Sequence, residues 1–465
     1  MTDDKSRTIS ERLCAWTSAV QYADLPSDVV EKEKLLILDS LGLAIAAAHE
    51  GEAKAVAEAA KILGKGSEST VIGTGERLPS TGAAMANAAQ IHAFDFDDTH
   101  IKAMLHSSCF IVATALAVAE ARHATGRDML TAAAIGHEAI VRLSLASGNA
   151  FYQRGLHTAG FFGPLGASLV ACKLGGADAQ RTAMAFGISC STGGGLLQGI
   201  IDGSDVKMLH PGWAAAGGII ASRLAELGFT GPRQVLEGDM GYYKALARPG
   251  IPLDSVVEDL GRRWEIRNIG FKLYPSEHGT HYFMESALYL KKHHGIPLED
   301  ITEIRCRVNS VRYHQSFEPY EVKYSPPSAY SARFSLPYLI GARLMLDHVG
   351  LGAFSPENLR SPAILSLARK VTRELDGEAV PSLEGLGHVT IRTKDGREYS
   401  HRIEALRGTT QNPASKSDIE AKFRANAGMA LPERQMQALV DAVEDLENQK
   451  DIGNLIKLTV ASGHA

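Results

Sequence analysis

The segment from His92 to His106, HAFDFDDTHIKAMLH, places three aspartates, three histidines, a threonine and a lysine close together in an otherwise alanine-rich chain. Phe94 and Phe96 favour burial, whereas the neighbouring carboxylates resist burial unless they have partners. Carboxylates and imidazoles that are buried together shift one another's pKa values, and enzymes use such groups for acid and base catalysis. The segment therefore predicts a site of proton transfer. An acidic helix cap with satisfied neighbours is the structural alternative.

Three further segments carry groups that could complete such a site. His157 lies between glycines in GLHTAG, where a histidine could equally cap a helix. Lys207 lies near the start of DVKMLHPG, and an exposed structural lysine is the alternative there. Lys272, His278 and His281 occur in FKLYPSEHGTH, close to a change in the pattern of the chain. Because clefts between domains commonly hold ligands, we expect these last three side chains to contribute to a binding site.

A divalent metal site is the main alternative chemistry. A metal-dependent hydrolase would use carboxylates and imidazoles of the first segment, and the available donors are Asp95, Asp97, Asp98, His100 and His106. The spacing HExxH is absent from the sequence. The GxGxxG and GxxxxGK[ST] loops of nucleotide-binding proteins and the GxSxG elbow of serine hydrolases are absent too. The sequence therefore favours acid and base chemistry over a metal site.

Helical periodicity dominates the chain from Ser10 to about Leu227. Apolar residues recur at three- and four-residue spacing, and the many small side chains allow helices to pack closely in a multi-helix core. Helices are predicted from a start signal at residues 25–28 to about residue 45, and over residues 104–124, 128–146, 163–174 and 214–227. These helices would position the segments that carry His106, His157 and Lys207.

The pattern changes near Arg267. Residues 301–308, ITEIRCRV, alternate as in a half-buried strand, and residues 388–404 predict a hairpin that turns at Asp395-Gly396. Helices are expected over 335–346, 356–375, 417–426 and 432–448. We therefore predict a mainly α protein with a large all-α domain (1–267), a smaller α+β lid domain (268–407) and a helical tail (408–465) that completes the all-α domain.

The composition of the chain limits the classes of partner that it can bind. The chain has 465 residues, more than one hydrophobic core usually supports. Its net charge of −5 gives no general attraction to nucleic acid or to anionic membranes. The most apolar run, residues 41–48, is too short to span a bilayer, and the polar start lacks the apolar core of a signal peptide. Five scattered cysteines suit reduced thiols. We expect a cytoplasmic protein that binds neither nucleic acid nor a membrane.

Five ordered motifs resemble the MmgE/PrpD family over nearly the whole chain. They are DFDDT followed by a histidine, G-x-H-x-[TA], K-x-[LH]-H-x-G, FKxYP with a downstream histidine, and S-x-P-Y in the second domain. The family includes 2-methylcitrate dehydratase, cis-aconitate decarboxylase and iminodisuccinate epimerase. The resemblance implies a homodimer with the site between an all-α domain and an α+β lid. It also implies a small polycarboxylate substrate and no metal or organic cofactor.

The resemblance assigns site residues one by one, namely Asp95, Thr99, His106, His157, Lys207, Lys272 and a tyrosine in the Tyr- and Pro-rich segment 320–333. That tyrosine is Tyr320 by spacing, with Tyr324 as the alternative, and its segment could close over the cleft or form a packing surface. Methylcitrate dehydratases continue DFDDT into WGHPSDN, whereas this chain reads HIKAMLHSSCF. The decarboxylase branch would place a histidine five residues after Lys272, where this chain has Glu277 followed by His278. The epimerase branch is then the closest likeness.

We therefore predict a cofactor-independent epimerase that inverts a carbon next to a carboxylate of an iminodisuccinate-like polycarboxylate. Two groups must remove and return a proton on opposite faces, and His106 and His157 suit this because imidazole titrates near neutrality. Asp95 or Asp98 would orient one imidazole. The substrate carboxylates would be bound by Lys207 and Lys272 with help from Thr99, Tyr320, His278 and His281. The alternatives are a lyase of the same family (2-methylcitrate dehydratase or cis-aconitate decarboxylase), a metal-dependent hydrolase and a non-catalytic protein that keeps only the fold.

Overall fold

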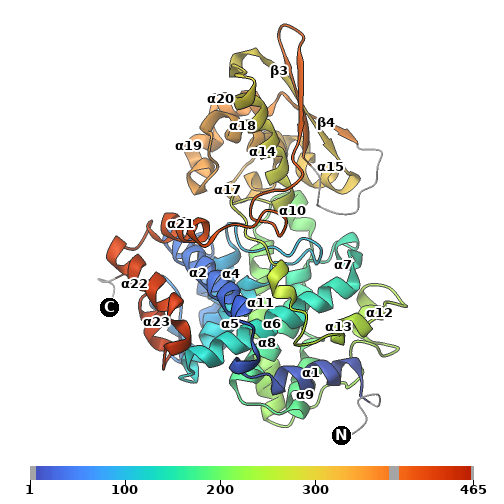
Figure 1. Ribbon diagram of the computed structural model, residues 1–465, viewed down its shortest axis with the longest axis vertical. Coiled ribbons are helices and arrows are strands. Elements are labelled where there is room, and N and C mark those ends of the chain that lie inside the picture. The colour runs from blue at the N-terminus through green and yellow to red at the C-terminus, as the bar shows by residue number, and fades with distance from the viewer. Residues whose placement is uncertain (1–6, 376–386, 462–465) are drawn as a thin grey trace.

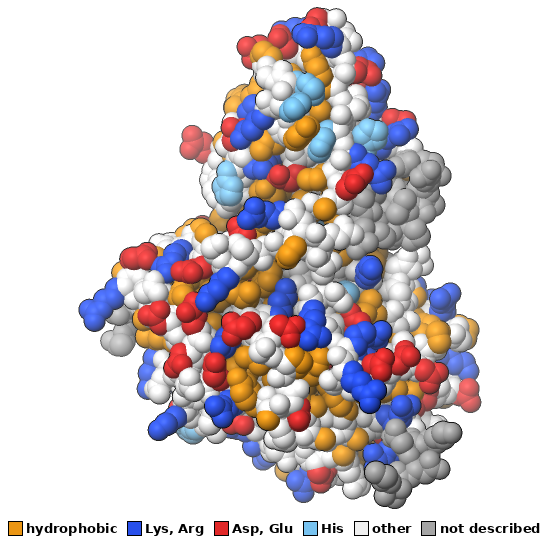
Figure 2. All heavy atoms as spheres, viewed as in Figure 1, with side chains coloured by type: hydrophobic (Ala, Val, Ile, Leu, Met, Phe, Trp, Pro, Cys, Tyr) orange, Lys and Arg blue, Asp and Glu red, His pale blue; other side chains and the backbone are white. Residues whose placement is uncertain are grey.

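The computed structural model describes residues 7–375 and 387–461. Figure 1 shows a broad lower lobe of helices and a narrower upper lobe that contains the larger sheet. We call residues 7–273 and 405–461 the helical lobe and the described residues of 274–404 the small lobe. Helices predominate in both lobes, so the prediction of a mainly α protein is confirmed. On the face shown in Figure 2, cationic and anionic side chains are mixed over both lobes.

The helical lobe is built around one large apolar core. Its main helices are α1 (Ile9–Ala19), α2 (Ser27–Glu50), α4 (Ser80–His92), α5 (Ser108–Ala121), α6 (Gly126–Ser147), α8 (Thr158–Leu174), α9 (Ala179–Ser189) and α11 (Val206–Glu226). Shorter elements are α3 (Lys54–Ala60), α7 (Ala150–Gln153), α10 (Gln198–Asp202), α12 (Tyr242–Leu246), α13 (Asp254–Val257) and the strands β1 (Ser69–Thr70) and β2 (Arg77–Leu78). Helix α11 packs against α8 and α4, which brings three segments far apart in sequence to the same region.

Helix α6 illustrates why this sequence forms a multi-helix core. A capping box at its start pairs the side chains of Thr125 and Asp128 with backbone N–H groups and so satisfies the first turn. Helix α6 is long and apolar enough to cross a membrane by length and composition, but 89% of its apolar window is buried inside the protein. The apolar residues of α6 therefore pack in the core of the protein.

The small lobe combines helices with a four-stranded sheet. Its helices are α14 (His278–His293), α15 (Ser310–Phe317), α16 (Tyr320–Tyr324), α17 (Ala329–Ala332), α18 (Leu336–Leu346), α19 (Pro356–Leu359) and α20 (Pro362–Ala368). The strands are β3 (Ile301–Val308), β4 (Val371–Leu375), β5 (His388–Thr393) and β6 (Glu398–Arg402), in the order β4-β3-β5-β6. Strand β4 is parallel to β3, and the other pairs are antiparallel. The predicted strand at 301–308 and the predicted hairpin are confirmed.

Several predicted helices have different bounds in the structure, and those expected over 163–174 and 214–227 begin earlier, at Thr158 and Val206. The helix expected over 104–124 begins only at Ser108, because Met104 has a left-handed backbone (φ 50°) and the preceding residues form a tight loop between His100 and Leu105. The helix expected over 356–375 is wrong in its second half. Ser361 caps a new helix at Pro362, and residues 371–375 form β4 instead. A proline and a change of hydrogen-bonding partner therefore overrode the helical periodicity.

The helices after residue 407 pack on the helical lobe. They are α21 (Lys416–Ala427), α22 (Glu433–Glu444) and α23 (Gly453–Lys457), of which α21 and α22 contact α2 and α23 contacts α5. The ammonium of Lys422 binds the buried carboxylate of Asp39 at 2.7 Å and the carbonyl of Phe96 at 2.7 Å. The tail thus supports the segment that contains the predicted site. The domain boundaries at 267 and 407 stay predictions.

The chain connects the two lobes twice, and both connecting segments lie together beside the predicted site. The backbone of Thr99 exchanges two hydrogen bonds with Gly270, at 2.9 and 2.8 Å, and the N–H of Phe271 donates to the carbonyl of Gly408 at 2.8 Å. Thr99 belongs to the first predicted motif, and Gly270 lies two residues before Lys272. This junction therefore fixes the first motif relative to the small lobe.

Candidate active site

Asp95 is the centre of a buried ionic cluster just after the end of α4. Its two carboxylate oxygens accept hydrogen bonds from Lys207 Nζ at 2.6 Å and from Lys272 Nζ at 3.0 Å, and Lys272 also donates to the Asp95 carbonyl at 2.9 Å. Burial would raise the pKa of Asp95, but the two ammonium groups hold it well below its usual value. The backbone of Asp95 is left-handed, with φ 49°, a conformation that costs free energy outside glycine. The lysines therefore hold Asp95 ionised and in this conformation.

His92 extends the cluster from the last turn of α4. Its Nδ1 donates to the carboxylate of Asp97 at 2.8 Å, and its Nε2 accepts a hydrogen bond from Lys207 Nζ at 2.7 Å. All three side chains are buried. Lys207 is thus directed by two acceptors, Asp95 and His92, and the alternative of an exposed structural lysine is wrong.

His106 is held as a neutral imidazole. Its Nδ1 donates to the carbonyl of Asp98 at 2.8 Å, because a carbonyl oxygen can only accept. The neutral ring therefore has its lone pair on Nε2. Burial and the positive charges of Lys272 and Lys207 hold the pKa of His106 well below its usual value. Thr99 Oγ1 lies 3.1 Å from the same Nδ1.

His157 shares a proton with a second histidine. It occupies the position just before α8, but its side chain does not cap that helix. Its Nδ1 lies 2.9 Å from Nδ1 of His210, and its buried Nε2 has no hydrogen-bond partner among the described residues. Burial and the charge of Lys207 lower the pKa of both rings, to about 4 for His210. Whichever ring carries the shared proton, the neutral pair lets His157 present Nε2 as a lone pair or as an N–H.

These groups line one narrow cavity of about 50 Å³ between the two lobes. The helical lobe contributes Asp95, Thr99, Met104, His106, Tyr152, His157, Thr158, Leu197, Ile200 and Lys207, and the small lobe contributes Glu277, His278 and Phe334. The imidazoles of His106, His157 and His278, the ammonium of Lys207 and the carboxylates of Asp95 and Glu277 therefore line the same space. Such an arrangement can remove a proton from, or return it to, a carbon acid whose developing charge is stabilised by the lysine.

Several predicted site residues do not line this cavity. The carboxylate of Asp98 caps α5 by accepting hydrogen bonds from the N–H groups of Ser107 and Ser108, so only its carbonyl orients His106. Lys272 is fully buried behind Asp95, and His281 donates to the carbonyl of Ser276. Asp95 or Asp98 was predicted to orient one imidazole, and Asp98 does orient that of His106, but through its backbone carbonyl and not its carboxylate. His210 and a backbone carbonyl have that role.

The predicted tyrosine also lies away from the cavity. Tyr320 is 57% exposed and stacks on Tyr324, with ring centroids 4.2 Å apart, and the hydroxyl of Tyr324 donates to the carbonyl of Val371. The tyrosine that lines the cavity is Tyr152, on α7. No sequence signal marked Tyr152. His92 and His210 were within quoted motifs; Asp97 lies five residues after His92, whereas His157 comes near His210 only in the folded chain.

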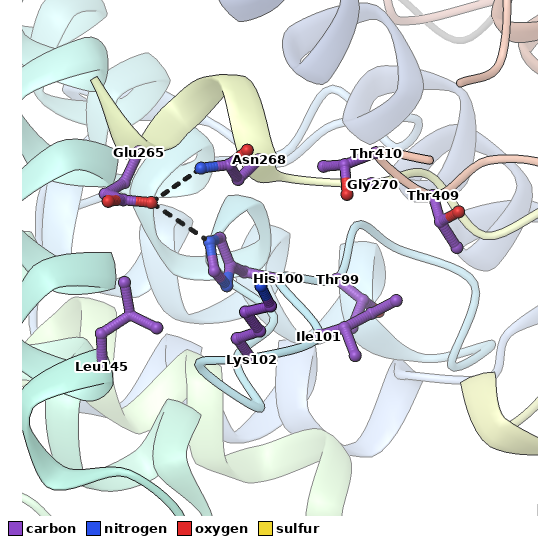
Figure 3. A pocket seen from close by; sticks show the side chains of 10 residues that line it. All are labelled: Thr99, His100, Ile101, Lys102, Leu145, Glu265, Asn268, Gly270, Thr409 and Thr410. Atoms are coloured by element: carbon purple, nitrogen blue, oxygen red, sulfur yellow. Dashed lines mark hydrogen bonds and ion pairs between the residues drawn. The ribbon is translucent and has the colours of Figure 1, made fainter. Parts of the chain in front are cut away.

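A second pocket lies on the other side of Thr99. It has a volume of about 260 Å³ and is bounded by residues of the first motif, α6, the 265–270 segment and Thr409-Thr410. Figure 3 shows His100 directed toward Glu265, whose carboxylate also accepts a hydrogen bond from Asn268 at 2.8 Å. The distance from His100 Nε2 to Glu265 Oε2 is 3.7 Å. His100 therefore belongs to the wall of this outer pocket and is separate from the candidate active site.

The donors present do not fit the metal-site alternative. Among the residues that the structure describes, the group within reach of one ion is His92, Asp97 and Cys109, which differs from the predicted set. Both ring nitrogens of His92 are already bound, one by Asp97 and one by the ammonium of Lys207. A metal ion at His92 Nε2 would have to displace that positive charge. The five cysteines carry no disulfide, as predicted.

The fold is mainly α with two lobes, and the cavity between them is lined by imidazoles, carboxylates and one ammonium group. The chain belongs to the MmgE/PrpD family: residues 11–252 match the MmgE/PrpD N-terminal domain and residues 274–448 match the C-terminal domain. It is 29% identical to the cis-aconitate decarboxylases of Mus musculus and Homo sapiens, over 97% of this chain and 93% and 94% of theirs. It is 28% identical to that of Aspergillus terreus, over 97% of this chain and 95% of that protein. The resemblance inferred from the five motifs is thus confirmed at the level of the family.

Proposed function

We propose that the protein is a lyase that forms and protonates a carbanion next to a carboxylate of a small polycarboxylate. The observation that carries the proposal is the pair of neutral imidazoles, His106 and His157, that line one cavity together with the ammonium of Lys207. The relatives named cis-aconitate decarboxylase favour this class of reaction over the isomerase expected from the motifs.

The geometry supports distinct roles for the three groups. When a bond to carbon dioxide breaks, or a proton leaves, the electron pair moves toward a neighbouring carboxylate, and a cation beside that carboxylate lowers the barrier. Lys207 is placed for this role by Asp95 and His92. His106 Nε2 serves as the base, because its other nitrogen donates to the Asp98 carbonyl. His157 returns the proton to carbon from Nε2 and recovers it through His210.

An epimerase remains the second candidate, because two neutral bases at one cavity also suit inversion of a carbon acid. The two candidates differ in their products. A lyase releases carbon dioxide or water and changes the carbon skeleton or its unsaturation, whereas an epimerase conserves the composition of the substrate.

The test is to incubate the purified protein in heavy water with cis-aconitate, 2-methylcitrate and iminodisuccinate and to follow the products by proton NMR. The proposal predicts one of two outcomes for at least one of them: loss of carbon dioxide with deuterium at the carbon that is then protonated, or loss of water together with a carbon-bound proton to give an alkene. Inversion without any loss would select the epimerase. Absence of both turnover and deuterium incorporation with all three would contradict the enzymatic proposal and leave the non-catalytic alternative. Treatment with a chelator is expected to leave activity unchanged.

A further inference from the structure

We propose that Glu33 and His137 are positioning residues that hold the loop of the candidate active site in the geometry that directs His106. This inference rests on the proposed function and extends it to two residues outside the cavity. Both side chains are fully buried where helices α2, α5 and α6 contact one another. Polar groups sealed in an apolar core cost free energy unless they are paired, so this pair requires an explanation.

The two side chains form a chain of hydrogen bonds that ends at the first residue of α5. A carboxylate oxygen of Glu33 lies 2.9 Å from Nδ1 of His137, and Nε2 of the same ring lies 3.3 Å from the hydroxyl of Ser108. All three side chains are buried, and they come from α2, α6 and α5 respectively. Each ring nitrogen of His137 thus has its own partner, and the two partners together fix the orientation of the imidazole.

Electrostatic interactions couple this chain to the candidate active site. Burial alone would lower the pKa of His137, but the carboxylates of Glu33 and Asp98 raise it above its usual value. Asp98 is the residue whose backbone carbonyl accepts the hydrogen bond from His106. The charge of Asp98 and a proton on His137 therefore stabilise each other across the start of α5.

Ser108 connects His137 to the loop that carries His106. Its N–H donates to one carboxylate oxygen of Asp98 at 2.9 Å, and the N–H and hydroxyl of Ser107 donate to the other oxygen at 3.1 and 3.0 Å. The carbonyl of Asp98 then accepts from Nδ1 of His106 at 2.8 Å. A displacement of Ser108 would move Asp98 and weaken the contact that leaves the lone pair of His106 on Nε2.

Helix α6 holds the same loop at a second point. The hydroxyl of Ser144, two turns after His137, donates to the carbonyl of Ala103 at 2.8 Å. Ala103 lies in the loop between Asp98 and His106. Because residues seven positions apart lie on the same face of a helix, one face of α6 supports both the loop and the start of α5. A reactive group is held most precisely when its supporting contacts come from such a rigid element.

The first measurement is the tautomer of His106, observed by nitrogen NMR of protein with isotopically labelled histidine. A protonated and a bare ring nitrogen give different signals, and the signals of His106 are those that disappear in His106→Asn. The wild type should show a proton on Nδ1 and a bare Nε2. In His137→Asn the amide can still donate to Glu33 but does not extend to Ser108. We expect a second set of His106 signals, from the other tautomer, in this variant.

Kinetics with the substrate identified in the assay above separates positioning from substrate binding. His137→Asn should lower kcat at least tenfold and change KM less than twofold, because the base is misdirected while Lys207 is untouched. Ser108→Ala removes only the hydroxyl that faces His137, and Glu33→Gln removes the charge but keeps the size. Each should lower kcat at least threefold. His137→Gln, whose amide extends to the position of Nε2, should recover part of the activity lost in His137→Asn.

The matched control is Ile140→Val on the same helix. Ile140 is fully buried, and its apolar side chain cannot take part in the chain of hydrogen bonds. This variant should unfold at a lower temperature than the wild type but keep its kcat and its His106 signals. The control therefore separates a loss of packing in α6 from a loss of positioning.

Three results would overturn the inference: a wild-type His106 without the proton on Nδ1, a single unchanged His106 tautomer in His137→Asn, or an equal loss of kcat in Ile140→Val. If His137→Asn does not fold, the His106 signals of Ser108→Ala decide by the same criterion. Failure of the proposed function is distinguishable, because the wild type would then show neither turnover nor deuterium incorporation. The tautomer measurement needs no turnover and would still decide whether His137 positions His106.

Discussion

At the scale of single residues, Asp95 is the group on which the site depends. Its carboxylate is the shared counter-charge of two lysines that are buried with it, and its left-handed backbone directs that carboxylate toward both. Breaking a buried ion pair by removing one partner leaves an uncompensated charge, which costs far more than the loss of an exposed pair. Asp95 therefore fixes the position of Lys207, and the proposed anion-binding role of Lys207 depends on that position.

We predict that Asp95→Asn lowers the free energy of unfolding by about 3 kcal/mol and reduces turnover more than a hundredfold, because Lys207 and Lys272 lose their shared counter-charge. Urea unfolding and steady-state kinetics would measure the two effects. The matched control is Asp239→Asn, which removes a fully exposed partner of Lys244 and should leave the unfolding free energy close to that of the wild type. Equal effects of the two substitutions would contradict the account.

The sequence predicted which residues form the site better than it predicted the contacts between them. Asp95, Thr99, His106, His157 and Lys207 were all predicted, and all line the cavity. His210 was missed because its partnership with His157 arises from the packing of α11 on α8, across 53 positions of sequence. The predicted role of Tyr320 failed for the same reason, since spacing places a tyrosine in a segment but does not direct its ring.

At the scale of elements, the close approach of the 193–195 loop to α8 positions the histidine pair. The N–H of His157 donates to the carbonyl of Gly195 at 3.0 Å, and the N–H of Gly194 donates to the carbonyl of Gly160 at 3.1 Å. A Cβ atom on Gly160 would lie 2.1 Å from the carbonyl oxygen of Gly194, which no real contact permits. The absence of a side chain on Gly160 therefore permits close packing of this loop beside the site.

We predict that Gly160→Ala displaces this loop and lowers turnover at least tenfold, with a loss of about 2 kcal/mol in the free energy of unfolding from overpacking. Kinetics and thermal unfolding would measure the two effects. Gly194→Ala is the matched control in the same contact. A Cβ on Gly194 meets nothing within 4 Å, so this variant should behave as the wild type. A fully active Gly160→Ala would show that the loop does not position His157.

The sequence predicted which segments form helices better than it predicted where the helices begin and end. The apolar periodicity of α2, α6 and α11 indicated helices because their buried faces repeat with the helical period. The start of α5 depends on Asp98, which lies ten residues before Ser108 and supplies the cap from outside the helix. Strand β4 forms because it pairs with the edge of β3, and the local sequence of residues 371–375 does not reveal that partner.

At the scale of the whole molecule, burial of neutral histidines links stability to pH. The pKa values of His106, His157 and His281 are well below the usual value, and that of His210 is about 4, in each case mainly because burial penalises the charged ring. Above about pH 6.5 these rings are neutral in both the folded and the unfolded chain. Below it the unfolded chain binds protons that the folded chain excludes, so stability falls with pH. Asp39, whose pKa burial raises to about 6, acts in the opposite direction.

We predict that the free energy of unfolding falls by several kcal/mol between pH 7.5 and pH 5, because each excluded proton contributes on the order of 1 kcal/mol per pH unit. Urea unfolding at both pH values measures this fall. In His210→Asn the decrease should be smaller by about 2 kcal/mol, since one excluded proton is removed. A stability that is flat over this range would mean that the rings are protonated in the folded protein.

The two lobes meet at the cavity and at the junction of Thr99, Gly270 and Gly408, so the site is a property of the whole chain. Arg333 of the small lobe also pairs with Glu52 of the helical lobe at 3.2 Å. The homodimer, the cytoplasmic location and the absence of nucleic-acid and membrane partners stay predictions.

The most direct test of the account is the rate at which His157→Gln exchanges the substrate's carbon-bound proton with heavy water, followed by proton NMR on the substrate identified in the assay above. We predict a loss of at least a hundredfold relative to the wild type, because general acid and base groups contribute on the order of 10² or more to such steps. The thermal unfolding temperature should stay near that of the wild type. The exposed His123→Gln, whose side chain is 81% accessible, should exchange at the wild-type rate. Exchange by His157→Gln at close to the wild-type rate would contradict the proton-transfer role on which the proposed function depends.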